Sequence, residues 1–170
     1  LTSLAAATRE SAVASLANLC AVQVPHLEGT RIAPSVEGSR RTGPGFSLIV
    51  PPDFQPLSVQ GIDSKVGAWA DSAGHEIAYD YGAGMDLDRL RARLVEYTEC
   101  RDSIGGFPVL LTAGYDTAGR TYSGRRVPQF VAIAHWRERQ PSPYMTVSVT
   151  SPDRAGLSRG LGVIRSVRFH

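Results

Sequence analysis

Three side chains in the first half of the chain have the chemistry of a nucleophilic catalytic site. Ser64, His75 and Asp80 would supply a nucleophile, a general base and an orienting carboxylate. Ser64 lies in GIDSKVG, however, which lacks the G-x-S-x-G pattern that projects a catalytic serine from a strand-to-helix turn. A turn in which Asp63 and Ser64 bond to the backbone explains the segment more simply. We therefore predict no catalytic residues, and the alternative is a hydrolase with its pocket between sheet and helix.

Histidine and acidic residues also raise the question of a metal site, because imidazole and carboxylate groups are ordinary metal ligands. His75 is close in sequence to Asp71, Glu76 and Asp80, on segments predicted to be adjacent strands. The four histidines of the chain form no HxH or HExxH pair. A solvated hairpin explains the acidic group around His75, and packing at a strand end explains His135. We predict no metal and no cofactor, with a metal-binding or small-ligand-binding domain as the alternative.

Cysteine spacing excludes some site classes. Cys20 and Cys100 form no CxxC pair, so they indicate neither a zinc site nor a redox pair of the thioredoxin type. In an oxidising compartment a disulfide between them would tie the N-terminal segment to the rest of the chain. In the chain-entropy model such a long loop contributes about 4.5 kcal/mol to stability. Two unpaired buried thiols remain the alternative.

Charge is divided unevenly along the chain. From Val50 to Cys100 there are nine acidic and four basic residues, whereas from Arg120 to His170 there are nine arginines and two acidic residues. A basic surface steers docking onto an acidic protein or anionic lipid head groups. Pairing between the two parts of the chain would explain the same distribution. Nucleic-acid binding is not predicted, because no RRM-type aromatic motif or helix-turn-helix accompanies the arginines. The candidate docking residues are Arg120, Arg125, Arg126, Arg137 and Arg139.

Apolar periodicity predicts the elements that would position these side chains. Alternation of apolar and polar residues is typical of half-buried strands, and Pro51 and Pro52 end the first of them. The short turn at residues 72–74 is typical of a hairpin. The predicted strands cover residues 46–50, 64–71, 75–82, 107–115, 128–136, 143–150 and 166–169.

Two helices are predicted to accompany the strands. In MDLDRLRARLVEY, Asp86 is the expected N-cap. The apolar stripe of this helix contains Leu87, Leu90, Leu94 and Tyr97. The second helix is predicted to start at Ser151 as cap, followed by a proline and an acid. Its buried side contains Leu157, Leu161 and Ile164. Glycines within this helix lower its propensity, so packing must stabilise it.

The N-terminal part of the chain differs in composition from the rest. Residues 1–24 are rich in Ala, Ser and Leu, which is compatible with the remains of an export signal, a surface helix or a segment laid on a partner. We expect a periplasmic or otherwise extracytoplasmic, membrane-associated protein. Residues 25–44 carry three prolines and three glycines without a sustained period, which is typical of an extended linker. No apolar stretch reaches the length of about 18 residues that a spanning helix needs.

The order of the elements predicts the architecture. We expect an N-terminal segment and arm at residues 1–42 and a single domain at residues 43–170. The predicted fold class is α+β: a mostly antiparallel sheet of about six strands flanked by helices as an α/β/α sandwich, with an extended N-terminal arm.

Several of these segments together resemble a known family. GFSLIVPPDF at residues 45–54, the hairpin, the central helix, three long strands and the final SVRF are similar to the domain shared by PsbP, the extrinsic subunit of photosystem II, and the nuclear-transport factor Mog1. The resemblance covers about residues 43–170. This PsbP/Mog1-like family acts mainly by docking onto larger assemblies, and no catalytic residues come with it. The resemblance implies a non-enzymatic accessory subunit with protein partners in a larger membrane-bound complex, photosynthetic or respiratory.

Overall fold

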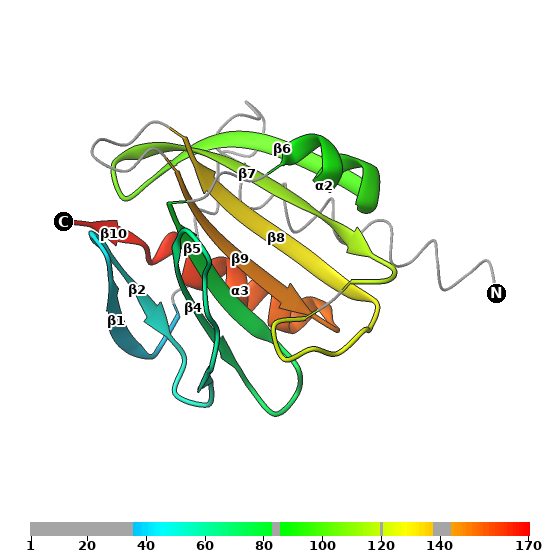
Figure 1. Ribbon diagram of the computed structural model, residues 1–170, viewed down its shortest axis with the longest axis horizontal. Helices are drawn as coiled ribbons and strands as arrows, with labels where there is room; N and C mark the ends of the chain where they lie inside the picture. Colours follow the sequence, from blue (N-terminus) through cyan, green and yellow to red (C-terminus); the bar gives the residue numbers. More distant parts are fainter. Residues whose placement is uncertain (1–35, 83–85, 120, 138–143) are drawn as a thin grey trace, which may run out of the picture.

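The computed structural model describes residues 36–82, 86–119, 121–137 and 144–170, and these residues form an α+β domain. Figure 1 shows a broad sheet with helices on both faces and a smaller sheet to one side. The broad sheet contains β3 (Gln55–Leu57), β4 (Lys65–Ala70), β5 (Glu76–Tyr81), β6 (Val95–Ile104), β7 (Phe107–Asp116), β8 (Gln129–Trp136) and β9 (Met145–Ser151). The smaller sheet contains β1 (Ser39–Gly43), β2 (Phe46–Val50) and β10 (Arg168–Phe169), and the helices are α2 (Leu87–Arg93) and α3 (Arg154–Arg165).

The broad sheet is antiparallel, in the order β3-β4-β5-β9-β8-β7-β6. Its strand β8 is buried along its whole length. Val131 and Ile133 point to one face and pack against Leu90 and Leu94 at α2. The intervening alanines point to the other face and join the main core with α3. The predicted α/β/α arrangement is confirmed.

The first predicted helix is shorter than expected. Asp86 is its N-cap, as predicted, because the Asp86 carboxylate accepts a hydrogen bond from the Arg89 N–H at 3.0 Å. The helix ends at Arg93, and the chain continues into β6, so the helical position predicted for Tyr97 is wrong. The predicted apolar residues still share one cluster: Leu87, Leu90, Leu94 and Tyr97. The spacing of these apolar residues fits a continuous helix and also a short helix followed by a strand. Periodicity therefore did not reveal that the helix ends at Arg93.

Helix α3 starts two residues later than predicted. Asp153 is its N-cap and accepts a hydrogen bond from the Gly156 N–H at 2.8 Å, whereas the predicted cap, Ser151, ends β9. The buried side of the helix is confirmed at Leu157, Leu161 and Ile164. Gly160 lets the helix approach the sheet, since a Cβ on this residue would lie 2.8 Å from the Cβ of Val149. Close packing therefore explains a residue that weakens the isolated helix.

The smaller sheet corrects two expectations. β1 pairs with β2, although its residues were predicted to belong to the arm, so the domain extends upstream of residue 43. β10 also pairs with β2, so these two strands lie outside the predicted single sheet. Two contacts attach the smaller sheet to the rest of the domain. The ring of Phe46 packs edge-to-face on that of Tyr79 in β5, with 5.0 Å between the ring centroids. The hydroxyl of Ser166, which follows α3, accepts a hydrogen bond from the Ile49 N–H at 2.7 Å. Residues 1–35 of the predicted arm lie outside the described residues.

Candidate functional site

His75 contacts the carboxylates of Asp71 and Asp153, but not that of Asp80. Its Nδ1 lies 2.6 Å from Oδ2 of Asp71, and its Nε2 lies 3.3 Å from Oδ2 of Asp153. In the β4–β5 hairpin, Ser64 and Asp80 lie near the end opposite to His75. The strand length puts about 15 Å between the two ends. The structure thus does not bring together Ser64, His75 and Asp80, the triad that the sequence analysis considered and set aside.

A different hydroxyl, that of Ser151, lies near His75 at the start of α3. The side chains of His75 and Ser151 both lie next to Gly156, where a Cβ would collide with each of them. The Ser151 hydroxyl donates to the carbonyl oxygen of Asp153 and accepts from the Asp153 N–H, so it is engaged in the turn from β9 to α3. The Gly156 N–H holds the pKa of Asp153 below its usual value, and His75 adds to this effect. These contacts join the β4–β5 turn to the start of α3.

Glu76, the acidic neighbour of His75, points into the protein. It is only 3% exposed, and its carboxylate accepts hydrogen bonds from the backbone N–H of Tyr122 at 2.6 Å and of Ser123 at 3.0 Å. Such bonds compensate for burial of a charge. Of the three acidic residues considered as metal ligands beside His75, only Asp71 contacts it, since Glu76 binds the loop and Asp80 lies at the other end of the hairpin. No group of three or more potential metal ligands occurs in the part of the chain that the structure describes.

The two N–H groups bound by Glu76 belong to a turn between β7 and β8 (residues 121–127), here named the docking loop because it contains Arg125 and Arg126, two of the residues predicted to take part in docking. The Thr121 N–H donates to the Arg125 carbonyl, and the Gly124 N–H donates to the Thr121 carbonyl, both at 3.0 Å. The Arg125 N–H donates to the Thr121 hydroxyl at 2.9 Å. Gly124 has a φ of 85°, which glycine adopts without steric strain. The loop backbone is thus fixed both by itself and by the sheet.

The docking loop presents aromatic, apolar and basic side chains to solvent. Tyr122 is 49% exposed and Val127 is 37% exposed, and Arg125 and Arg126 are exposed as well. Tyr122 is only partly exposed, because its hydroxyl turns back toward Ser148, and this partial burial raises the pKa of the hydroxyl above its usual value. Among the described residues, neither arginine of the loop has an ion-pair partner. Tyrosine and arginine are residue types that dominate binding energy at protein interfaces.

The other predicted docking residues are not part of this surface. Arg137 follows β8, whereas the docking loop precedes it, so the two lie at opposite ends of that strand. Eight residues of strand separate the ends by about 25 Å. Arg120 and Arg139 lie outside the described residues. The predicted docking residues in the described part of the chain therefore do not form one surface. Arg125 and Arg126 lie together on the docking loop, and Arg137 lies at the other end of β8.

Internal ion pairs account for some of the basic residues in the C-terminal part of the chain. Arg159 of α3 forms two hydrogen bonds to Asp53, one of them at 2.6 Å, and this contact lowers the pKa of Asp53. Arg165 lies 2.8 Å from Asp102 on β6. The alternative explanation by internal pairing thus holds for these two arginines but not for those of the docking loop.

Cys100 on β6 is disulfide-bonded. Cys20 lies outside the described residues, so the pairing of Cys20 with Cys100 stays a prediction. Disulfides are typical of proteins that fold in oxidising compartments and are rare in the cytosol.

The sequence analysis missed two residues of this site. It selected Arg125 and Arg126 but not Tyr122, although an aromatic residue beside the SG turn of TYSGRR is a readable signal for an exposed anchor. Glu76 was weighed only as a metal ligand. Nothing in the local sequence indicates that it would hold a loop 46 residues away.

None of the helices in the described ranges has the length and apolarity needed to span a bilayer.

No family model and no curated protein matches the sequence. The structure is similar to that of the Ran-binding protein Mog1p of Saccharomyces cerevisiae, with a TM-score of 0.53 at 12% identity over 79% of this chain and 96% of Mog1p. A structure from Bacteroides thetaiotaomicron gives a TM-score of 0.47 at 13% identity over 79% of this chain and 49% of its own. The residues that the structure describes have the PsbP/Mog1-like fold.

Proposed function

We propose that this protein is a non-enzymatic accessory subunit that docks onto an acidic protein partner through the docking loop. The observation that supports this most strongly is the anchoring of the Tyr122 and Ser123 N–H groups by the buried Glu76 carboxylate. A loop that is ordered before binding loses less conformational entropy when a partner arrives. The fixed turn therefore serves a surface that must keep its shape in solvent.

The side chains of the loop define the partner's chemistry. Arg125 and Arg126 carry guanidinium groups without ion pairs among the described residues, and such groups bind carboxylates with paired, charge-assisted hydrogen bonds. Tyr122 and Val127 add an apolar contact beside them. The matching surface is a cluster of acidic residues around a shallow apolar depression.

The fold agrees with a binding role without determining it. Mog1p is described as a Ran-binding protein, so one protein with this fold acts by binding another. A shared fold does not fix function, because function depends on the residues of a site. The docking loop, rather than the similarity, is therefore the basis of the proposal.

The place of action is also part of the proposal. We place the protein outside the cytoplasm, on a larger membrane-associated complex of a photosynthetic or respiratory kind. The disulfide at Cys100 supports an oxidising compartment. The composition of residues 1–24 supports export. Contact with anionic lipid head groups would use the same arginines, because phosphate oxygens also accept their hydrogen bonds.

Affinity purification from membranes of the source organism tests the proposed function. The tagged full chain is expected to retain a defined set of proteins, and retention is expected to fall as salt is raised, because exposed charges are screened. Arg126→Gln is expected to reduce retention about tenfold, as for a residue central to an interface. Mass spectrometry of the retained proteins identifies the partner.

Arg89→Gln is the matched control, because Arg89 is exposed on α2 and its substitution removes the same charge. This variant is expected to retain partners like the unmodified protein. Equal losses for both variants would show that only net charge matters. Binding to vesicles of anionic lipid, without retention of any protein, would contradict a protein partner.

A further inference from the structure

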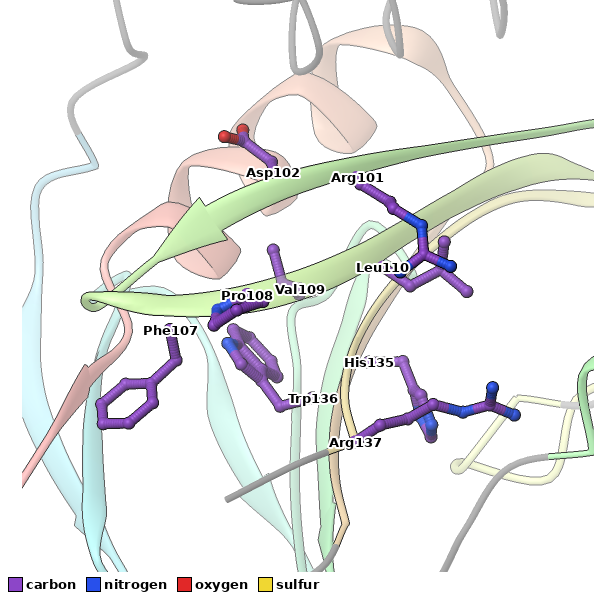
Figure 2. A pocket seen from close by; sticks show the side chains of 9 residues that line it. All are labelled: Arg101, Asp102, Phe107, Pro108, Val109, Leu110, His135, Trp136 and Arg137. Carbon is purple, nitrogen blue, oxygen red and sulfur yellow. The ribbon is translucent and has the colours of Figure 1, made fainter.

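A second site lies at the other end of β8, on the sheet face that carries α2. Val131, Ile133 and His135 point to this face in turn, and α2 covers the first two but not His135. Paired residues of antiparallel strands point to the same face. The pairing therefore forms a row across the sheet: Arg101, Leu110, His135 and Thr146. Figure 2 shows Arg101, Leu110 and His135 extending to the same side of the strands, together with Arg137.

His135 is the central feature of this row. The residue is 1% exposed, and neither ring nitrogen has a hydrogen-bond partner among the described residues. Tyr144 stacks on the ring with a centroid distance of 6.2 Å. Burial, with a smaller effect of Arg137, lowers the pKa of His135, so the ring is neutral and offers one donor and one acceptor. Buried polar groups without partners are rare in native proteins and call for an explanation.

A cavity of about 270 Å³ lies beside this ring. Its basic residues are Arg101 and Arg137, and neither forms an ion pair with another described residue. Leu110 and Pro108 supply an apolar wall on this face, and residues that belong to the main core or pack against it, Phe107, Val109 and Trp136, complete the apolar lining. The acidic residue at the cavity, Asp102, points to the opposite side of the strands, where it is bonded to Arg165 at 2.8 Å.

We propose that this cavity binds a small organic carboxylate with an apolar body. The carboxylate would accept hydrogen bonds from the guanidinium groups of Arg101 and Arg137, whose planar forks match its two oxygens. The His135 ring would donate its N–H to the same anion, which satisfies a group that is otherwise buried without a partner. The apolar body would lie on Leu110 and Pro108.

The cavity volume limits the size of the ligand. Pockets for drug-sized molecules are about 300 to 1,000 Å³, so this site suits a molecule with a single ring or a short branched chain. The site lies about 25 Å from the docking loop, at the other end of β8, so it is independent of the proposed function.

Titration with phenylacetate, followed by NMR of the full chain labelled with ¹⁵N, tests the proposal. The ¹⁵N signals of the His135 ring are expected to shift as phenylacetate is added. The shift is expected to reach saturation at concentrations on the order of millimolar, as for a weak ligand at a single site. Phenylethanol, which has the same ring but no charge, is expected to cause no such shift. Arg101→Gln and Arg137→Gln are each expected to weaken binding about tenfold, because each removes a charge-assisted contact.

Arg126→Gln is the control at the opposite end of β8, and it is expected to bind phenylacetate like the unmodified protein. All three substituted arginines are exposed, so the variants are expected to fold, and their amide spectra verify this. His135 signals that stay unchanged would overturn the proposal. Equal binding by Arg101→Gln, Arg137→Gln and Arg126→Gln would also overturn it. An equal shift with inorganic phosphate would overturn the assignment of an apolar body.

Discussion

The carboxylate of Glu76 accepts a hydrogen bond from the backbone N–H of Tyr122 at 2.6 Å, across 46 residues of sequence. Glu76 begins β5, and Tyr122 belongs to the docking loop between β7 and β8. The bond therefore connects the rigid sheet to the exposed side chains that we propose as the binding surface. Its energetic weight comes from burial, because Glu76 is 3% exposed and a buried charge without partners is costly.

Glu76→Gln is expected to release the docking loop. An amide group offers one acceptor oxygen where the carboxylate offers two, so either Tyr122 or Ser123 loses its partner. The free energy of unfolding should fall by about 1 to 3 kcal/mol. The hydrogen exchange of the Tyr122 and Ser123 amides should become faster in this variant, whereas exchange of the β8 amides should change less. Asp88→Asn, at an exposed site on α2, is the control, and equal exchange in all three proteins would contradict the anchoring role.

Gly160→Ala is expected to destabilise the protein although alanine favours a helix. The added Cβ would lie 2.8 Å from the Cβ of Val149, so α3 must move away from β9. Overpacking of this kind costs about 1 to 3 kcal/mol. Urea unfolding measures the change. Ser158→Ala, on the exposed side of the same helix, is expected to change stability by less than about 0.5 kcal/mol. An unchanged midpoint for Gly160→Ala would show that the contact is not tight.

The N-cap of α3 is expected to make stability depend on pH. The Gly156 N–H lowers the pKa of Asp153 in the folded protein. A carboxylate with a lowered folded pKa contributes stability above its unfolded pKa, near 3.9, and loses that contribution as pH falls through the folded value. The difference in unfolding free energy between the unmodified protein and Asp153→Ala should therefore be about 1 kcal/mol at pH 6 and smaller near pH 2.

Asp153→Asn separates the charge from the cap in that experiment. Asparagine keeps a side-chain oxygen that can accept from Gly156, but it does not titrate. Its stability relative to Asp153→Ala should thus not vary between acidic and neutral pH. A difference between the unmodified protein and Asp153→Asn that does not change with pH would contradict a lowered pKa at Asp153.

The predicted disulfide between Cys20 and Cys100 can be tested on the intact chain. Thiol titration of the denatured, unreduced protein should detect no free thiol, and a peptide containing both cysteines should appear after proteolysis. Reduction should lower the free energy of unfolding by about 2 to 5 kcal/mol. The variant with both cysteines replaced by serine is expected to be insensitive to reductant. Two titratable thiols in the unreduced protein would exclude the bridge.

Sequence patterns predicted most of the fold, because most elements bury one face. Alternation identified β4, β5, β7, β8 and β9, and Asp86 marked the start of α2. Strand β6 was not predicted, because Leu90, Leu94 and Tyr97 keep a helical spacing across the helix-to-strand boundary. β1 was assigned to the arm because its sequence SRRTG is polar and exposed, and only pairing with β2 makes it a strand.

The candidate site was less predictable, because it depends on contacts between distant segments. Arg125 and Arg126 were selected from charge alone, but the role of Glu76 becomes visible only when β5 and the docking loop are brought together. Arg137 was grouped with them, since charge counting does not show that β8 separates the two positions. His135 was interpreted as a packed residue, which burial confirms, but its unpartnered nitrogens are a property of the three-dimensional environment.

The most direct test of the docking surface is site-specific photo-crosslinking in native membranes. A photoreactive amino acid at position 126, on the docking loop, is compared with one at position 158, on the exposed side of α3. The account predicts a crosslinked protein from position 126 that is absent from position 158 and is lost when Glu76→Gln is added. Crosslinks of equal yield from both positions, or none from position 126 while position 158 reacts, would contradict it.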